Sequence, residues 1–475
     1  MTYDYDMIVI GAGAAGLTAA GMSALLGAKT ALIEEHRLGG ECTWTGCIPS
    51  KTLLRAARLA HEMRTADRFG LAVSAPQFSF GGLMQHVRAI RQQVYEQADA
   101  PPNMERLGVE VIAGSAQFTG PHSIQVSGRV WTSRYFVIAT GSRPKQPKFS
   151  EPCLSNETLF EINALPARLL VLGGGPIGME MAQAFQRLGS TVTIVGSDSR
   201  ILPKDDPQHA RMLQDCLASE GISFILGHKA SAVERQGGEL SATLDDSRTI
   251  RCDAVLAAIG REANMANLKL ESAGVEYGAR GIRVDRRCRT NQKHIFATGD
   301  VTGQHQFTHM AEHMSKVAVT NAILGWPATV DEKHAVWSTF TEPELAHLGE
   351  SEAELSKRGA RYLIYRLPFE KLDRAITEAQ TGGEIKVMAT KSGQILGASI
   401  IGANAGEMIS EYALAMRNGI SLSKIAATIH PYPTYALGNR KTADLASFKQ
   451  LDSPLLALFG KLRGLRGVRK GSAAL

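Results

Sequence analysis

The sequence predicts a multidomain α/β protein in which two parallel-sheet units are followed by a smaller α+β domain. Three observations predict this fold class. The chain has 475 residues, more than a single hydrophobic core usually serves. Strand–glycine turn–helix–strand patterns begin at residues 7 and 169. Beyond about residue 335 the pattern changes to short strands and helices without a glycine-rich turn of this type.

The first unit has the features of a dinucleotide site. Its strands and helix are predicted at residues 7–10, 17–26 and 29–33, and its turn contains Gly11, Gly13 and Gly16. An acid, Glu34, ends the second strand eighteen residues beyond the last glycine. A GxGxxG turn alone is a weak signal, but a turn between strand and helix with an acid at this distance indicates pyrophosphate and ribose binding. The glycines would let the backbone approach the pyrophosphate at the helix N-terminus, and Glu34 would bind the ribose.

The second unit repeats this architecture without the acid. Its elements are predicted at residues 169–172, 179–188 and 191–195, and its turn contains Gly173, Gly175 and Gly178. Gly196 stands where a ribose-binding carboxylate is usual, with Arg200 and Lys204 close behind. This favours the 2′-phosphate of NADPH, although Asp198 could still serve NADH. Two dinucleotides in one chain suit hydride transfer from a nicotinamide to a flavin.

Three further strands each end in a small residue and a glycine. They occupy residues 136–141, 254–260 and 294–300. Each would bring a strand end close to a bound ligand, and Asp300 could hydrogen-bond a sugar-like chain.

The C-terminal part reads as an α+β domain without its own nucleotide. Helices are predicted at residues 352–357 and 405–418, and strands 384–389 and 395–401 would pair across a turn at residues 391–393. A third domain of this kind is often an oligomerisation unit.

Composition and charge exclude several classes of protein. Hydrophobic residues at 44% and charged residues at 21% exclude wholesale disorder. No apolar run is long enough to cross a bilayer, and the acidic start does not resemble a secretory signal, so we expect a cytoplasmic protein. Residues 453–475 hold five basic and no acidic residues, which leaves the rest of the chain at only +1 of the net +6. A nearly neutral body does not indicate a nucleic-acid partner.

The sequence chemistry centres on Cys42 and Cys47. Four other cysteines (Cys153, Cys216, Cys252 and Cys288) are scattered singly and read as small buried hydrophobes. Pro49 suits the first turn of a helix, so Cys47 would lie at a helix N-terminus, where a thiolate is stabilised. A zinc site needs about four ligands, and no second Cys or His pair has matching spacing. We therefore predict redox use of the pair and no metal site.

Together these motifs, from about residue 5 to residue 445, resemble the pyridine nucleotide–disulfide oxidoreductase family. The resemblance implies FAD in the first unit, NADPH or NADH in the second, and a homodimer built through the C-terminal domain. By motif position, Cys42 would be the interchange thiol that meets substrate, and Cys47 the thiol next to the flavin. Lys51 would pair with Glu180 near the reactive edge of the flavin.

The resemblance also implies further contacts and boundaries. Candidate cofactor contacts are Gly40, Lys51, Thr140, Gly141, Asp300 and His309 for FAD, and Gly260 for the nicotinamide nucleotide. The predicted domains are residues 1–155 (FAD-binding, first part), 156–275 (NAD(P)H-binding), 276–335 (FAD-binding or central, second part), 336–450 (dimerisation) and 451–475 (basic amphipathic tail).

One segment departs from the pattern of the thiol–disulfide members. They carry a His-Pro-Thr segment with a Glu five residues after the His, a dyad donated across the dimer that moves protons on and off substrate sulfurs. Aligned on Pro433-Thr434, the His position is Tyr432 and the Glu position is Leu437; His430 falls two residues early. Tyrosine titrates near 10, so efficient dithiol–disulfide exchange is not expected. A tyrosine at this position instead resembles mercuric reductase, whose substrate is a soft metal ion, although we expect neither the N-terminal metal-binding domain nor the tail cysteine pair of that enzyme here.

Several alternatives stay open. The leading interpretation is a mercuric-reductase-like enzyme; dihydrolipoamide dehydrogenase or another disulfide reductase is a rival. Leu455, Leu458, Phe459, Leu462 and Leu465 recur at helical spacing beside basic residues, so the tail could contact an anionic membrane, or it could dock on the protein or be disordered. Membrane contact would suit a quinone reductase. A flavoprotein redox sensor is the non-enzyme alternative.

Overall fold

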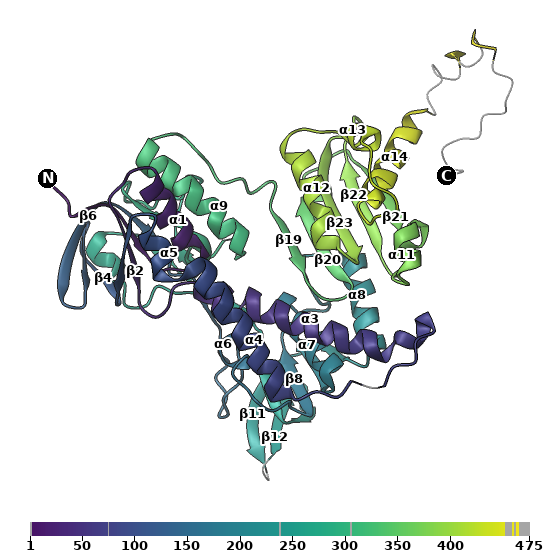
Figure 1. The fold of residues 1–475 in the computed structure, drawn as a ribbon, viewed down its shortest axis with the longest axis horizontal. Coiled ribbons are helices and arrows are strands. Elements are labelled where there is room, and N and C mark those ends of the chain that lie inside the picture. Colours follow the sequence, from purple (N-terminus) through teal and green to yellow (C-terminus); the bar gives the residue numbers. More distant parts are fainter. Residues whose placement is uncertain are drawn as a thin grey trace. The chain divides into compact units, whose positions relative to one another are not determined.

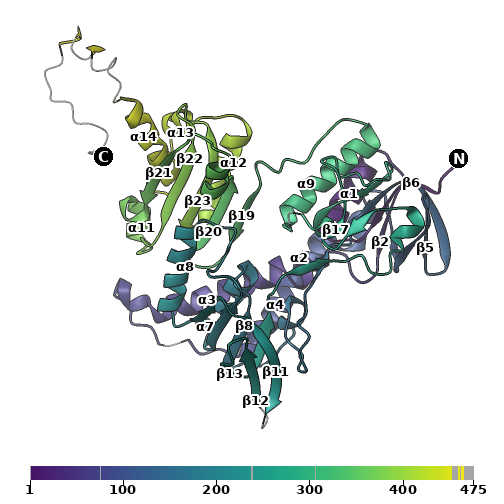
Figure 2. The same ribbon diagram turned by 180° about the vertical axis from the view of Figure 1, so that it is seen from behind.

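The computed structural model describes residues 2–74, 76–236, 239–304, 306–451, 458–459 and 462–464. The chain forms two compact units, Met1–Ser197 with Ser223–Asp331 and Asp198–Ile222 with Glu332–Leu475 (Figures 1 and 2). No helix among the described residues is long and apolar enough to cross a membrane. Of the predicted tail helix, Leu458, Phe459 and Leu462 are exposed, whereas Leu455 and Leu465 lie outside the described residues.

The first sheet of unit 1 is parallel at its centre. Its parallel strands, in spatial order, are β3 (Val109–Ala113), β2 (Thr30–Glu34), β1 (Tyr5–Ile10), β6 (Arg129–Ile138) and β18 (Ile295–Ala297). Beyond β6 the sheet continues antiparallel through β5 (Ser123–Val126) and β4 (Ala116–Gly120). Helices α1 (Ala14–Leu25) and α9 (Thr308–Val319) lie side by side on one face of its centre (Figures 1 and 2). Helices on such faces explain why these strands read as continuous apolar runs.

A second parallel sheet lies in the same unit. Its strands, in spatial order, are β10 (Ser223–Leu226), β9 (Thr191–Gly196), β8 (Arg168–Leu172) and β14 (Ala254–Ala257), with α7 (Pro176–Leu188) connecting β8 to β9. Two antiparallel sheets adjoin it in sequence: β11 (Ala230–Gln236), β12 (Glu239–Leu244) and β13 (Thr249–Cys252), and the pair β7 (Ser142–Pro144) and β15 (Arg261–Ala263). Both predicted strand–turn–helix–strand units are therefore confirmed, with ends that differ by a few residues.

Unit 2 is built on one antiparallel sheet. Its strands, in spatial order, are β19 (Val336–Thr339), β20 (Glu344–Gly349), β23 (Ile395–Gly402), β22 (Glu384–Ala389) and β21 (Leu363–Pro368). The predicted hairpin of β22 and β23 is confirmed. An apolar core joins the sheet to α12 (Ala405–Arg417), α13 (Leu422–Ala427) and α14 (Leu437–Leu451) (Figure 1).

The opposite face of this sheet carries several buried polar side chains, and α8 (Pro207–Ser219) is hydrogen-bonded to two of them, Lys386 and Ser399. Because side chains alternate along β22, Ile385 and Val387 enter the apolar core while Lys386 points the other way. Lys386 is only 2% exposed and its Nζ lies 2.5 Å from an oxygen of Asp206, which caps α8, and 2.5 Å from Glu352. His209 of α8 is fully buried and lies 2.7 Å from Ser399 Oγ. Residues 198–222 thus pack with the C-terminal sheet as part of unit 2. The predicted NAD(P)H-binding domain, residues 156–275, includes this segment in sequence.

This buried ion cluster makes a stability prediction. Lys386→Met leaves the Asp206 carboxylate, 7% exposed, without its cation, so we expect the free energy of unfolding to fall by about 3–5 kcal/mol. Burial raises the pKa of Asp206, but Lys386 and His209 outweigh it and lower that pKa overall. The stabilisation is therefore present above the unfolded-state pKa of the carboxyl and is lost as the pH falls through the folded-state value.

Urea denaturation at pH 7 and at about pH 2, well below the ordinary carboxyl value of 3.8, would measure both effects. The control is Lys441→Met, which breaks the exposed 3.8 Å pair with Asp373 and should cost about 0–1 kcal/mol. A Lys386→Met loss as small as that of the control would contradict the account.

Candidate functional site

The two cysteines of the predicted redox pair lie on consecutive helices. Cys42 is in α2 (Gly40–Trp44), and Cys47 is the first residue of α3 (Cys47–Arg64), with Pro49 in the first turn as predicted. The two sulfurs are not joined by a disulfide in this structure. Thr308, the first residue of α9, places its Oγ1 3.5 Å from each sulfur. Residues far apart in sequence therefore converge on one half-buried sulfur pair.

The pair holds one negative charge, and that charge resides on Cys47. A hydrogen bond from Cys42 lowers the pKa of Cys47 to about 6; burial opposes this, whereas Thr308 and the charge of Lys51 add to it. The same hydrogen bond and burial raise the pKa of Cys42. The N-terminus of α3 also favours an anion at its first residue. Cys47 is thus a thiolate at neutral pH while Cys42 remains a thiol.

Lys51 and Glu180 form an ion pair beside the cysteines. Lys51 Nζ lies 2.9 Å from an oxygen of Glu180, which comes from α7 and is only 7% exposed at its side chain. The pair ties α3 to α7 and holds the Lys51 ammonium where it acts on Cys47.

The charge distribution makes a pH prediction. In the reduced protein, alkylation of Cys47 by iodoacetamide should rise with pH along a curve with its midpoint near 6, because only the thiolate reacts. In Cys42→Ala the largest stabilising hydrogen bond is gone, so the midpoint should move upward. Mass-spectrometric mapping of the alkylated peptide at each pH gives both curves. A midpoint for the parent protein near 8.5, the ordinary thiol value, would contradict the account.

The first glycine turn fits a pyrophosphate. A Cβ at Gly16 would lie 1.7 Å from the Gly11 carbonyl oxygen, and Gly11 itself has φ +96°, so both glycines are required by the turn. A Cβ at Gly13, in contrast, would meet only Gly40 Cα, at 3.8 Å, among the described atoms. The N-terminus of α1 has no side-chain cap in the described structure. Open space over uncapped N–H groups is what an anionic diphosphate needs.

Glu34 completes this turn. One carboxylate oxygen accepts a hydrogen bond from the Ala12 N–H at 2.7 Å and the other accepts from the His36 N–H at 2.8 Å. The carboxylate is thereby fixed beside the turn, at the end of β2, where a ribose would lie.

In the second turn, as in the first, two glycines are required by the backbone and the third leaves open space. A Cβ at Gly173 would lie 2.2 Å from the Ala258 oxygen, and one at Gly178 would lie 2.2 Å from the Gly173 oxygen. At Gly175, no described atom lies within 4 Å of the added Cβ. Helix α7 likewise begins without a side-chain cap or an acid in its first turn among the described residues.

The chain matches known protein families over most of its length. A family model described as pyridine nucleotide-disulphide oxidoreductase matches residues 5–315, and the model of its dimerisation domain matches residues 336–441. The chain belongs to the pyridine nucleotide-disulphide oxidoreductase family. It is accordingly a flavoprotein disulfide reductase of a family of enzymes that use FAD and NAD(P)H, and its dimerisation domain implies a homodimer.

Similar proteins in this family carry different names. A mercuric reductase from Bacillus cereus is 33% identical over 92% of this chain and 70% of its own length. A dihydrolipoyl dehydrogenase from Thermus scotoductus is 35% identical over 93% of this chain and 97% of its own length. Among solved structures, LpdA from Mycobacterium tuberculosis matches with a TM-score of 0.86 and 26% identity, over 92% of this chain and 99% of LpdA. The HOCl-induced flavoprotein disulfide reductase RclA from Escherichia coli matches with a TM-score of 0.83 and 28% identity, over 93% of this chain and 99% of RclA.

The predicted cofactor contacts at the strand ends fall into two groups. Gly141 and Gly260 have open space beside the backbone, whereas the side chains of Thr140 and Asp300 already form hydrogen bonds. Gly141 and Gly260 have φ of +69° and +106°, and an added Cβ would meet no described atom at Gly141 and only the Lys145 side chain, at 3.9 Å, at Gly260. Thr140 Oγ1 donates to the Asn264 oxygen at 2.6 Å, and the Asp300 carboxylate accepts from Ser142 Oγ at 2.6 Å.

His309 and Arg200 are less directly placed. His309 is exposed near the start of α9, and its ring stacks on Phe307 with centroids 5.6 Å apart. Arg200 donates to the backbone oxygens of Leu202, Pro203 and Asp205 in its own loop, so part of its donor capacity is already used.

The segment with the altered dyad is fully described. Tyr432 is 71% exposed, and its hydrogen bond to Asp373 raises the pKa of the phenol. Leu437, at the Glu position, is buried at the start of α14. His430 has an acidic partner that the sequence did not indicate: its Nε2 lies 2.9 Å from Glu411 in α12, and its Nδ1 lies 3.0 Å from the Thr428 oxygen.

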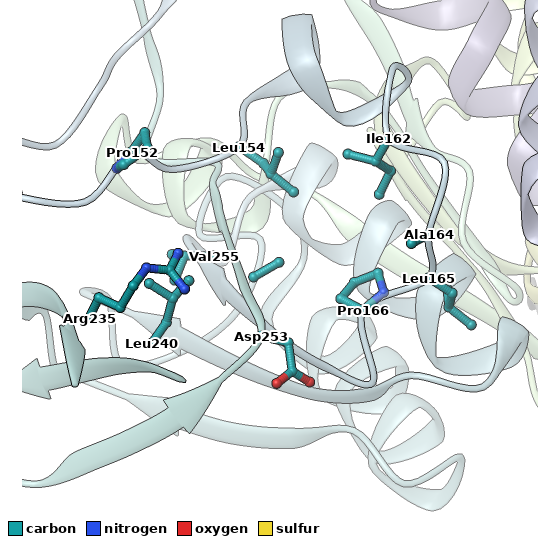
Figure 3. Close-up of a pocket in the computed structure, with 11 residues that line it drawn as sticks. Pro152, Leu154, Ile162, Ala164, Leu165, Pro166, Arg235, Leu240, Asp253 and Val255 are labelled. Atoms are coloured by element: carbon teal, nitrogen blue, oxygen red, sulfur yellow. The ribbon is translucent and has the colours of Figure 1, made fainter. Parts of the chain in front are cut away.

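A pocket of about 350 Å³ lies elsewhere in unit 1 (Figure 3). Leu154, Ile162, Leu165, Pro166 and Val255 give it an apolar lining, with Arg235 and Asp253 at its edges. The Asp253 carboxylate is bonded to Arg168 at 2.6 Å. None of the predicted site residues lines this pocket, so it is separate from the sulfur pair.

Sequence reasoning missed Thr308 and a polar cluster around Glu41. Glu41 is bonded to Asn156 and Arg261, and Arg261 also donates to Ser142 Oγ at 2.8 Å. The signal that the sequence offered is that each missed residue is next to a predicted site residue: Glu41 precedes Cys42, Arg261 follows Gly260, and Thr308 precedes His309.

Proposed function

We propose that this enzyme uses NADPH, through FAD, to reduce a Cys42–Cys47 disulfide, and that the resulting thiol–thiolate pair reduces a soft metal ion bound by thiols. The observation that carries the proposal is the sulfur pair itself, with its thiolate on Cys47 and its thiol on Cys42. Thiolates are the ligands that soft metal ions prefer.

In this proposal the two glycine turns hold the cofactors. Gly11, Gly13, Gly16, Glu34, Gly40, Lys51, Thr140, Gly141, Asp300 and His309 would hold FAD; Gly173, Gly175, Gly178, Arg200 and Gly260 would hold the nicotinamide coenzyme. FAD, when bound, supplies hydride acceptance from the coenzyme and two-electron reduction of the disulfide. Preference for NADPH is supported by the missing acid at Gly196 more than by Arg200, whose donors are partly used.

The roles of the chain's own residues follow from their contacts. Cys47 holds the negative charge of the reduced pair, and Lys51, held by Glu180, stabilises that charge. Cys42, as the thiol, is the group that would meet the acceptor. Tyr432 would contribute a neutral phenol from the dimerisation domain, since its pKa is raised.

The metal-ion acceptor has support from relatives. Mercuric reductases are among the similar proteins, and two solved structures of RclA, at 27% identity and a TM-score of 0.83, are described as Cu(II) complexes. A second candidate is the oxidation of dihydrolipoamide or the reverse reduction of lipoamide, which the equally similar dihydrolipoyl dehydrogenases favour. Tyr432 and Leu437, in place of a His–Glu dyad, argue for the metal ion.

Initial rates of NADPH and NADH oxidation would test the proposal. Mercuric ion in excess thiol, cupric ion in excess thiol, oxidised lipoamide and a soluble quinone would each be offered to the parent enzyme and to Cys42→Ser. Metal-dependent turnover that is lost in Cys42→Ser is the expected result. Fast lipoamide turnover would establish the second candidate, and quinone turnover that survives the substitution would move the function to the flavin.

A further inference from the structure

Reduction of the sulfur pair creates a negative charge. The His–Glu dyad that moves protons in the thiol–disulfide members is replaced in this chain by Tyr432 and Leu437. Both ring nitrogens of His430 already contact oxygen atoms, of Thr428 and Glu411, within 3.0 Å. Tyr432 is held neutral by its hydrogen bond to Asp373. Both residues belong to unit 2, so the groups that the structure places around the sulfur pair are those of unit 1.

Glu41 lies beside both cysteines. It precedes Cys42 in α2, and its Cγ packs against Gly46, the residue before Cys47; a Cβ added at Gly46 would lie 3.3 Å from that Cγ. One carboxylate oxygen accepts from Asn156 Nδ2 at 3.1 Å, and the other pairs with the Arg261 guanidinium. The side chain keeps 34% of its surface exposed, so its carboxylate can exchange protons with solvent.

Burial and the charges around Glu41 together set its pKa near neutral pH. Burial raises the pKa of Glu41 to about 7; Arg261 lowers it, and the charges of Asp300, Cys47 and Glu157 raise it. These groups come from β15, from the turn after β18, from α3 and from the α6 turn (Asn156–Leu159). A neutral disulfide carries no charge, so the contribution of Cys47 exists only after reduction.

We propose that Glu41 takes up a proton when the Cys42–Cys47 disulfide is reduced to a thiol–thiolate pair and releases it when the pair is reoxidised. This inference rests on the proposed function, since it requires the disulfide to be redox-active.

The step balances as follows. NADPH delivers a hydride equivalent, the S–S bond breaks, two electrons enter the sulfurs, and the hydride's proton ends on Cys42, leaving Cys47 as thiolate and NADP⁺ as product. A proton from solvent joins the Glu41 carboxylate, so part of the charge gained on Cys47 is compensated within the site. Reoxidation re-forms the S–S bond, passes two electrons to the metal-ion acceptor, and releases the Cys42 and Glu41 protons to solvent. Compensation of this kind lowers the cost of a partly buried charge.

Proton uptake on reduction tests this directly. The oxidised holoenzyme would be reduced anaerobically by one equivalent of NADPH in weak buffer at pH 7, and a pH indicator would count the protons removed from solvent per NADP⁺ formed. The parent is expected to take up as much as about half a proton more than Glu41→Gln, because a carboxyl group with a pKa of about 7 is half protonated at pH 7. The matched control is Glu262→Gln on β15, an exposed acid paired with Arg143 at 2.6 Å, which should behave as the parent.

The pH profile separates a proton-holding role from a structural one. The difference between parent and Glu41→Gln should be largest below pH 7, between the pKa values of Glu41 in the oxidised and the reduced protein, and should shrink on either side. Glu41→Asp should restore part of it. Equal uptake in parent and Glu41→Gln, with two electrons still entering the sulfurs, would overturn the inference alone. A parent disulfide that accepts no electrons would instead overturn the proposed function.

A measurement on the parent enzyme decides the matter if Glu41→Gln does not fold. The reduced-minus-oxidised infrared difference spectrum should gain the carbonyl band of a protonated carboxyl group at pH 7. A spectrum without that band would overturn the inference.

Discussion

Cys47→Ser is expected to lower NADPH-dependent turnover of a thiol-bound metal ion by at least about 10³-fold, because a serine cannot form the disulfide that receives and stores the electron pair. It also removes the thiolate that Thr308 and Lys51 stabilise. The measurement is the initial rate of NADPH oxidation with the metal ion in excess thiol, at equal content of bound FAD.

The matched control for this prediction is Cys216→Ser. Cys216 lies in α8, where its sulfur is 4.0 Å from the Glu342 oxygen, and it belongs to unit 2. Its replacement should leave turnover unchanged. Equal losses in the two variants would show that general destabilisation, and not loss of the disulfide, lowers the rate.

Gly175→Ala is expected to weaken binding of the nicotinamide coenzyme by about 10- to 100-fold while the protein folds normally. The added methyl group meets no described atom within 4 Å, so the fold is unaffected. It would fill the space through which a pyrophosphate approaches the backbone N–H groups, and a hydrogen bond to a charged group is worth about 1.5–3 kcal/mol. Fluorescence titration with NADP⁺ and NAD⁺ measures the loss.

Gly178→Ala is the informative comparison. Its methyl group would lie 2.2 Å from the Gly173 oxygen, so this variant should lose thermal stability as well as coenzyme binding. Unchanged coenzyme affinity in Gly175→Ala would mean that the second turn does not hold a pyrophosphate.

The parallel sheets were predictable because local signals mark them. β1 and β8 are apolar runs that end at glycine turns, and those turns need glycine for reasons the residues themselves impose: φ is +96° at Gly11 and +116° at Gly173. The packing of α8 was not predictable, because the polar face that receives it comes from β22 and β23, almost two hundred residues later. No local pattern in residues 198–222 predicts contacts with strands so much later in the sequence.

The sequence predicts only those site residues that belong to a recognisable motif. Cys42, Cys47, Lys51 and the glycines stand in recognisable spacing, whereas Thr308 and Arg261 reach the site through tertiary contacts alone. His430 is the reverse case: the alignment left it without an acid, and the fold supplies Glu411 from α12. Spacing along the chain reveals partners within one element, but it does not reveal partners that two elements bring together.

The most direct test of the account is the number of electrons that the oxidised enzyme accepts. Anaerobic titration with dithionite should require about four electrons per subunit, two for FAD and two for the Cys42–Cys47 disulfide, and about two in Cys42→Ser. A parent enzyme that accepts only about two electrons, indistinguishable from Cys42→Ser, would show that the sulfur pair takes no part in the reaction.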